Sequence, residues 1–550
     1  MVALVGCKKE GGGGAAASDL PPELTPQPVK IDVSKLAVPA LFANVPADTP
    51  YLLGALEPVP AELYAKLKTA LGPLVERAVR EAGKLGEDNQ VVQAILSELD
   101  GKWTAAGFES LGFSARPTFA IYGLGLQPLV ARLEVKDHKA VQATIERIAA
   151  KAGKTLPPIE TRDGRNYWKI VKPDGTTAAV IGFADNQVIA AVGTAADIDA
   201  KLGVILGTEK PAQTMADGVL VKELMTRHGM GPHLIGFGDT RRIAALGAQA
   251  AGAKLSPACS SEVERLGAKV PRVVIGYAEL SGARTTGGMV FELAPDVASE
   301  LRALKVEIPG LGAALSDQPA MAFAAGIDLA RGQQLALSVA GTLKRLGETC
   351  EIAELAHGAG EAQDSLSRPL PAPAGQILGV VVAVREVELA AGGQGGPMPT
   401  KLEAVAAIAS PDAKALFAKL QELVPPLKSF AIPVDGKLHD IGGVQLPLPF
   451  PVSAGVGDKA IVIASGDKRA AAGDKLLAAR AVGKAPLFAM SYDATKLIEL
   501  EMKAMGMSDA QLDQLGGGAF KTMRNLLGRV GGTFDVTDAG LAMWGSVEIK

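Results

Sequence analysis

The sequence predicts an α+β protein made of two tandem homologous halves, residues 36–308 and 309–550, each a mostly antiparallel sheet with helices packed on one face. Three observations lead to this prediction. Similar segments recur in the same order along the chain, and strand pairs joined by short turns outnumber strand–helix–strand units. Hydrophobic residues make up 48% of the 550 residues and charged residues 21%. That composition supports a large core and excludes a mainly disordered chain.

The clearest repeat is a strand followed by a helix. Segments 232–243 and 486–497 both read as a proline, an apolar strand, an aspartate seven residues after the proline, and the start of a helix. The aspartates are Asp239 and Asp493, and aspartate is a good helix cap because its carboxylate accepts free backbone N–H groups. We therefore expect both helices to begin directly after these aspartates.

Four further pairs of segments keep the same order, with strands, turns and helices in matching places. Segments 49–52, 130–150, 185–194 and 274–293 match segments 318–321, 402–423, 458–467 and 530–549. Several ordered matches indicate a duplication more strongly than any one of them would.

Helices outside these matched segments are also predicted. An additional helix is expected near Gly218 to Arg227 in the first half alone. The amphipathic stretches Ala61 to Leu85 and Ala330 to Leu355 occupy equivalent places, and we expect them to cover the sheets. The apolar run Ile377 to Val384 ends at Arg385, so it predicts a buried strand and not a membrane-spanning helix.

The N-terminus carries a motif of its own. Leu4-Val5-Gly6-Cys7 resembles the lipobox of bacterial lipoproteins. This resemblance implies that Cys7 is acylated and anchors the chain to a membrane, and Lys8 after the cysteine favours the outer membrane. Only six residues precede Cys7, fewer than a signal peptide needs, so either the true start lies upstream of Met1 or the match is accidental.

The residues after Cys7 predict a tether. Glycines and alanines at 11–17 are flexible, and the proline-rich stretch 21–28 is stiffer, so we treat 1–35 as a separate region. The following segment, Val45 to Pro50 before an apolar strand, is similar to uncharacterised bacterial envelope proteins built from such repeats. That similarity implies a location and a fold class.

Two cysteines remain besides Cys7. Cys259 and Cys350 are an even pair, which the oxidising cell envelope would allow to form a disulfide. The alternative is that they are two unrelated buried thiols. The sequence leaves both interpretations open.

The motifs of enzymes and metal sites are incomplete. His228 and His233 lie five residues apart, but no HExxH or paired CxxC motif supplies further ligands for zinc. The segment Ser465 to Lys468 matches S-x-x-K, in which a lysine activates a serine. Its match in the first half lacks both groups, so we interpret Asp467 as a helix cap. We predict no catalytic residues, no metal and no cofactor.

Charge and composition also limit the partners. With 56 basic and 59 acidic side chains the formal net charge is −3, and aromatic residues make up 4%, so nucleic acid is not an expected partner. The leading hypothesis is a non-catalytic, lipid-anchored cell-envelope protein that binds an envelope protein or a glycan. The alternative is a periplasmic carrier of an apolar ligand or lipid, and an enzyme with an unrecognised site is a third interpretation.

Overall fold

The computed structural model describes most of the chain. The described residues are 24, 36–85, 90–250, 255–316, 318–390, 398–424, 427–428, 432–441, 449–481, 483–505, 511 and 518–550. The predicted lipidation site Cys7 and the predicted tether, apart from Leu24, lie outside them.

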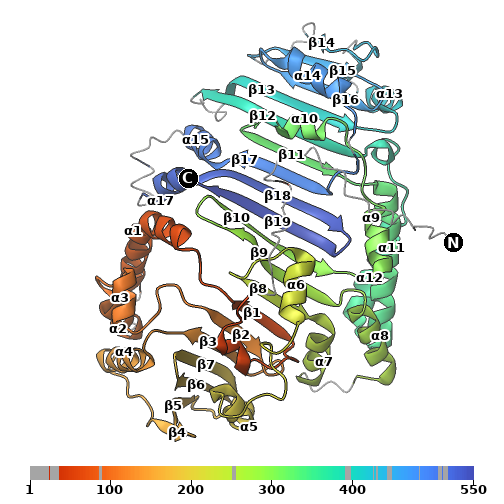
Figure 1. The fold of residues 1–550 in the computed structure, drawn as a ribbon. Coiled ribbons are helices and arrows are strands. Elements are labelled where there is room, and N and C mark those ends of the chain that lie inside the picture. Colours follow the sequence, from red (N-terminus) through yellow and green to blue (C-terminus); the bar gives the residue numbers. More distant parts are fainter. Residues whose placement is uncertain are drawn as a thin grey trace, which may run out of the picture.

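The fold confirms the α+β prediction with a large antiparallel sheet (Figure 1). Its first ten strands are β1 (Tyr51–Ala55), β2 (Phe119–Gly123), β3 (Leu129–Glu134), β4 (Glu160–Arg162), β5 (Arg165–Val171), β6 (Thr177–Ala184), β7 (Gln187–Thr194), β8 (Ile235–Asp239), β9 (Arg272–Leu280) and β10 (Arg284–Glu292). The other nine are β11 (Met321–Gly326), β12 (Gly379–Ala390), β13 (Met398–Ala409), β14 (His439–Asp440), β15 (Val452–Val456), β16 (Ala460–Ser465), β17 (Phe488–Asp493), β18 (Leu527–Thr537) and β19 (Gly540–Ile549).

Every strand pairing in this sheet is antiparallel. Strands β1–β10, here called the first half of the sheet, lie in the order β4-β5-β6-β7-β3-β2-β1-β8-β9-β10. Strands β11–β19, the second half, continue in the order β19-β18-β17-β11-β12-β13-β16-β15-β14. Strand β10 pairs with β19 from Arg284 to Glu292, so the two halves meet edge to edge in the middle of the molecule (Figure 1).

Helices fill the connections between the strands. In the first half they are α1 (Ala61–Leu85), α2 (Gln90–Leu99), α3 (Ala105–Ser110), α4 (His138–Lys151), α5 (Ala195–Leu206), α6 (Leu220–His228), α7 (Thr240–Ala250), α8 (Pro257–Gly267) and the linking helix α9 (Pro295–Arg302), with the 3₁₀ turn η2 (Ala40–Asn44). In the second half they are α10 (Leu311–Ser316), α11 (Leu329–Thr349), α12 (Ala353–Leu366), α13 (Ala413–Leu423), α14 (Arg469–Ala478), α15 (Ala494–Ala504), α17 (Ala519–Leu526) and the turn η3 (Ala374–Gln376). None of the described helices combines the length and the apolar character needed to cross a bilayer.

Several local predictions agree with these bounds. Helix α1 covers the predicted range, and the additional first-half helix is α6. Asp493 caps α15 by accepting the backbone N–H groups of Thr495 and Lys496 at 3.0 and 3.1 Å. Asp239 accepts the N–H of Arg242 at 3.0 Å at the start of α7. The stretch predicted as one helix to Leu355 instead breaks after Thr349, and Glu351 has a positive φ of 57°.

The prediction that helices pack on one face of each sheet is wrong. Adjacent residues of β7 point to opposite faces: Ile189 packs in the core with helix α5, whereas Val188 packs with Val141 of helix α4. Strand β16 does the same, with Val462 in the core with α14 and Ile461 against α13. Because strands at these two ends are apolar on both sides, each side attracts a helix.

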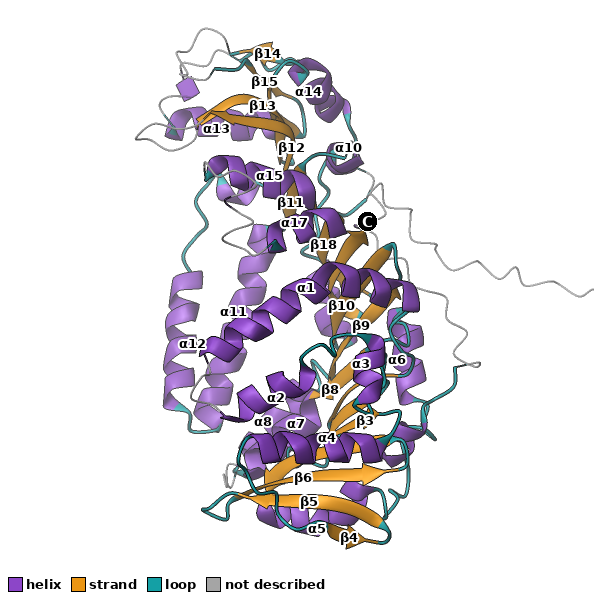
Figure 2. Cartoon of the chain, turned by 90° about the vertical axis from the view of Figure 1, so that its left-hand side faces the viewer, coloured by secondary structure: helices purple, strands orange, loops and turns teal. Residues whose placement is uncertain are grey.

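Over the centre of the sheet the two faces differ. We call the face covered by η2, α5, α6, α10 and α14 the core face, and the opposite one the open face. Helices α6 and α10 lie on one side of the sheet, and α11 and α12 lie on the other (Figure 2). The core face holds the two largest apolar clusters. Its central residues are no more than 3% exposed, namely Leu52, Val274, Val290, Ala324, Ala489 and Ala542.

On the open side, a helix from each half packs against the other half. Helix α1, which follows β1, packs Leu63 against Leu526 of α17 and Ile549 of β19. Helix α11, which follows β11, lies against α8 of the first half, where Arg345 and Glu262 form an ion pair at 3.2 Å. We call α1 and the α11–α12 pair the crossed arms. They stand at opposite margins of the sheet (Figure 1).

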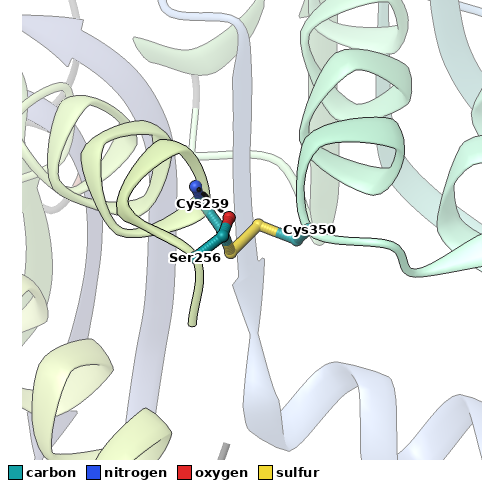
Figure 3. Close-up of a disulfide and its surroundings, with 3 residues drawn as sticks. All are labelled: Ser256, Cys259 and Cys350. Atoms are coloured by element: carbon teal, nitrogen blue, oxygen red, sulfur yellow. Dashed lines mark hydrogen bonds between the residues drawn. A yellow bond between two sulfur atoms is a disulfide. The ribbon is translucent and has the colours of Figure 1, made fainter. Parts of the chain in front are cut away.

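A disulfide fastens one of these arms. The sulfur atoms of Cys259 in α8 and Cys350 at the end of α11 are bonded, joining residues 91 apart in sequence (Figure 3). Ser256 caps α8 by accepting the N–H of Cys259 at 3.1 Å. The covalent bond therefore links the first half directly to the arm that comes from the second half.

Candidate functional site

A continuous row of apolar side chains crosses the open face. One residue from each central strand lies directly opposite the next in the strand register, from β3 to β12. All but Gly236 are half-buried or exposed, with Ile275 at 42% and Phe488 at 38%. We call this set the apolar row: Ala131, Ile121, Leu53, Gly236, Ile275, Met289, Met543, Phe534, Phe488, Ala325 and Val380.

This arrangement is unusual for an antiparallel sheet. Such a sheet normally alternates apolar residues towards the core with polar residues towards water. Here the residues between the buried positions are apolar as well, although the helices of the open side leave the centre of that face partly exposed. Contiguous exposed apolar surface of this kind marks interaction sites. The apolar row is therefore the strongest candidate binding surface among the described residues.

A pocket of about 520 Å³ opens at one margin of this face, between the ends of β11, β12 and β13 and helix α15. We call it the C-terminal pocket. Its lining combines apolar and charged side chains. The lining residues are Gln318, Ala320, Met321, Val384, Arg385, Glu386, Val387, Glu388, Glu403, Lys468, Lys496, Leu497, Glu499, Leu500 and Lys503.

Two carboxylates of this pocket, Glu403 and Glu386, have close hydrogen-bond partners. Glu403 is 6% exposed and accepts the backbone N–H groups of Asp467 and Lys468 at 2.6 and 3.1 Å. Glu386 binds Lys401 at 2.9 Å, and this hydrogen bond lowers the pKa of the Glu386 carboxyl. Asp467 does not cap helix α14, so the cap predicted at Asp467 is wrong. Glu403 instead binds the backbone of the turn that precedes the helix. The sequence contained one signal for Glu403, a charged residue inside an apolar strand.

A second pocket, of about 570 Å³, lies in the first half, near the start of β1, the end of β2 and helix α7, and we call it the N-terminal pocket. Its cations are tied to backbone carbonyls. Lys201 donates to the carbonyl oxygens of Gln127, at 3.1 Å, and of Leu124, and Arg242 donates to that of Asp48. The other lining residues are Pro46, Thr49, Pro50, Gly123, Gly125, Val204, Pro211, Ala245 and Leu246.

A buried ionic cluster lies on the core face at the end of β10. Glu292 is 6% exposed and binds His228 at 2.9 Å, Arg227 at 3.0 Å and Arg272 at 3.1 Å. Burial opposes ionisation, but the hydrogen bond and charge of His228 and the two arginines outweigh it and lower the pKa of Glu292. Since each of its partners is a cation or a protonatable ring, we interpret the cluster as an anchor for helix α6.

A second ionic cluster joins two helices of the first half. Glu98 of α2 is 4% exposed and binds Arg147 and Lys151 of α4 at 2.7 and 2.8 Å, and Lys102 at 3.3 Å. The hydrogen bonds from Lys151 and Arg147 lower the pKa of Glu98 to about 2. This carboxylate therefore stays ionised at any ordinary pH and holds α2 on α4.

The other residues singled out from the sequence are not brought together. His228 belongs to the Glu292 cluster, and His233 lies in the turn before β8 with its Nδ1 atom buried and unpaired in the described part of the chain. Ser465 ends β16 and Lys468 binds Glu403 through its backbone. Within the described ranges, no group of three or more His, Cys, Asp or Glu residues is placed to hold a metal ion.

Comparison with known proteins adds no further information: no family model, no curated protein and no solved structure matches this chain.

Proposed function

We propose that this protein is a non-catalytic, lipid-anchored binding protein of the cell envelope, which holds an apolar ligand against the open face. The apolar row is the observation that carries the proposal. Its side chains are half-exposed and uncharged from β3 to β12, whereas their neighbours on the core face are buried. The free energy of covering such a surface is roughly 25 cal/mol for each Å² removed from water.

The proposed location has its own support. Disulfides persist in oxidising compartments such as the bacterial periplasm, and Cys259 and Cys350 are bonded. The lipobox-like segment ending at Cys7 and the glycine-, alanine- and proline-rich residues after it fit a tethered domain. The anchor and the binding surface would then act together, because the tether keeps the ligand site near a membrane.

We further propose that the two halves of the sheet arose by duplication. In β1, Leu52 pairs with Tyr122 and Phe237, and in β11, Ala322 pairs in the same way with Ala383 and Ser491. Apart from the extra strand β4, the strand order on either side of the β10–β19 seam is the same, which supports a common origin. With these registers matched, residues of the two pockets coincide: Asp48 with Gln318, Pro50 with Ala320, Gly123 with Val384, Leu124 with Arg385, and Arg242 with Lys496.

The ligand-binding proposal is tested by native mass spectrometry of the full-length protein purified from membranes. We expect an apolar molecule to co-purify with the wild type, and to be lost when Met289→Asp and Phe488→Asp place charges in the apolar row. Val219→Asp is the matched control, because Val219 is 65% exposed but lies at the start of α6, away from the row. A wild-type protein that carries no ligand and binds none when fatty acids are added would refute the proposal.

The anchor is tested separately by cell fractionation. We expect Cys7→Ser to move the protein from the membrane fraction to the soluble fraction, and mass spectrometry of the wild type to find acyl chains on Cys7. A wild-type protein with an unmodified Cys7 in the soluble fraction would contradict the lipid anchor, while the apolar-ligand proposal would remain.

A second candidate function is supported by the α11–α12 arm. Val339 and Leu343 lie one turn apart on α11 and are 50% and 38% exposed. Such a stripe suits a partner protein that packs a helix against it. Cross-linking from Val339→Cys in cells would capture this partner, and an unchanged pattern relative to a cysteine at Lys154 would count against it.

A further inference from the structure

We infer that the C-terminal pocket receives the anionic head group of a lipid whose acyl chain lies on the open face. This inference rests on the proposed apolar-ligand function and specifies the ligand. Three lysines of the pocket, Lys468, Lys496 and Lys503, have exposed side chains. Within the described part of the chain, none of the three has a carboxylate partner at ion-pair distance.

The neighbouring carboxylates leave these ammonium groups available. Both oxygens of Glu403 are taken by backbone N–H groups, and Glu386 binds Lys401, which does not line the pocket. Glu388 lies 3.8 Å from the same Lys401. Glu499 also lines the pocket, and Lys468 and Lys496 act on the Glu386 carboxyl through their charge, but in the described part of the chain neither carboxylate forms an ion pair with the three lysines. An anion entering the pocket therefore meets three ammonium groups that have no direct carboxylate partner. Charge-assisted hydrogen bonds from lysine to carboxylate or phosphate are among the strong ones.

The pocket is continuous with the apolar row. Met321 lines the pocket and is 38% exposed, and on the same strand Phe323 and Ala325 point to the same face because successive side chains alternate. Phe323 lies opposite Met490, and Ala325 lies opposite Phe488 in the row. A chain leaving the pocket over Met321 would thus contact apolar side chains without interruption. Because the three lysines adjoin this apolar path, the pocket favours an anionic lipid over an isolated anion.

The N-terminal pocket differs in the feature that the inference needs. Its Lys201 and Arg242 already donate to backbone carbonyls, and Arg242 lies 3.8 Å from Asp239. We therefore assign the head group to the C-terminal pocket alone. We therefore expect each full-length protein molecule to bind one anionic lipid, and not two, with selectivity for its head group.

The test compares laurate with neutral 1-monolauroylglycerol by isothermal titration calorimetry on the full chain. We expect laurate to bind more tightly, and the triple variant Lys468→Gln, Lys496→Gln, Lys503→Gln to weaken laurate about tenfold while leaving monolauroylglycerol unchanged. The matched control is Lys154→Gln, Lys172→Gln, Lys210→Gln, three exposed lysines outside both pockets. Phe323→Asp should weaken both lipids.

The possible results separate this inference from the function on which it rests. Equal binding of the two lipids, unchanged in the triple variant but lost in Phe323→Asp, would overturn the head-group site and retain the apolar-ligand proposal. Inorganic phosphate that binds as tightly as laurate would overturn the lipid assignment. Binding of neither lipid to the wild type would overturn both. Circular dichroism of each variant checks that it is folded.

Discussion

The two halves of the sheet place a glutamate at matching positions of their last strands but neutralise it in different ways. Gly288 lies opposite Trp544 at the β10–β19 seam, and Glu292 and Glu548 each follow four residues later. Glu548 pairs with Arg284 directly across the seam at 3.4 Å, whereas Glu292 faces Gly540, which has no side chain. In the first half, helix α6 supplies His228 and Arg227 instead.

This difference makes helix α6 necessary to the fold of the first half. A glutamate at the seam requires a cation. Glu548 receives it from the strand across the seam, whereas Glu292 receives it from Arg272 of the neighbouring strand β9 and from helix α6. Since Gly540 has no side chain, the negative charge of the buried Glu292 is balanced by helix α6 and Arg272 alone in the described part of the chain. The first half should therefore depend on its glutamate far more than the second half.

The largest expected effect follows from breaking the buried cluster. Glu292→Ala leaves two arginines and His228 without their common anion, and loss of one partner of a buried ionic group typically costs 3 to 5 kcal/mol. We expect the free energy of unfolding in urea to fall by about 4 kcal/mol. If Glu292→Ala lowers the free energy of unfolding no more than Glu548→Ala does, the proposed difference between the two glutamates is refuted.

The next effect concerns the crossed arms, of which only one is covalently fastened. Cys259→Ser with Cys350→Ser removes a link between residues 91 apart, and such bonds typically contribute 2 to 4 kcal/mol. We expect the free energy of unfolding in urea to fall by about 3 kcal/mol. Reducing the wild type with dithiothreitol should lower it by the same amount. If dithiothreitol also destabilises the double variant, its effect does not come from this bond.

A smaller effect is expected from Glu98, the ionic contact between α2 and α4. Its pKa is about 2 in the fold and near 4.5 when unfolded, so its contribution is complete above pH 4.5 and is lost as the pH falls towards 2. Allowing for screening by solvent at its partly exposed partners, we expect Glu98→Gln to cost about 2 kcal/mol at pH 7. The difference from the wild type should shrink below pH 4.5, and a difference that is constant between pH 3 and pH 7 would contradict this assignment.

The smallest effect is predicted at the second-half pair. Arg284 and Glu548 are 30% and 42% exposed, and exposed ion pairs contribute about 0 to 1 kcal/mol. Arg284→Ala should therefore change the free energy of unfolding by about 0.5 kcal/mol. A loss of several kcal/mol would show that the seam, and not α6, is the more sensitive place.

The sequence was most informative where structure depends on neighbours along the chain. One local pattern, a proline followed by an apolar strand and a capping aspartate, predicted β8 with α7 and β17 with α15. The pattern is readable because its parts lie within about ten residues of each other. Helix α6 and the start of α1 could be predicted from the sequence for the same reason. Apolar residues on both sides of strands such as β16 indicated burial, but they gave no indication of which side a helix would cover.

The candidate site was hidden because its parts are distant in sequence. Met289 and Met543 are opposite each other only after β10 and β19 have paired, so the apolar row cannot be seen in any one segment. Glu403 binds the backbone of the turn before α14, more than sixty residues later in the chain. The lysines of the C-terminal pocket look like ordinary surface residues until Glu403 and Glu386 are known to have other partners.

The pairing of β10 with β19 also determines which strands form the two edges of the sheet. Among the described residues, joining the two long strands leaves β4, with three residues, and β14, with two, as the outermost strands. Such short borders offer little backbone for a further strand to add to, which protects a wide sheet from growing into fibres. Residues 36–308 alone would uncover the nine-residue β10. We expect that fragment to form dimers through this strand, as light scattering would detect.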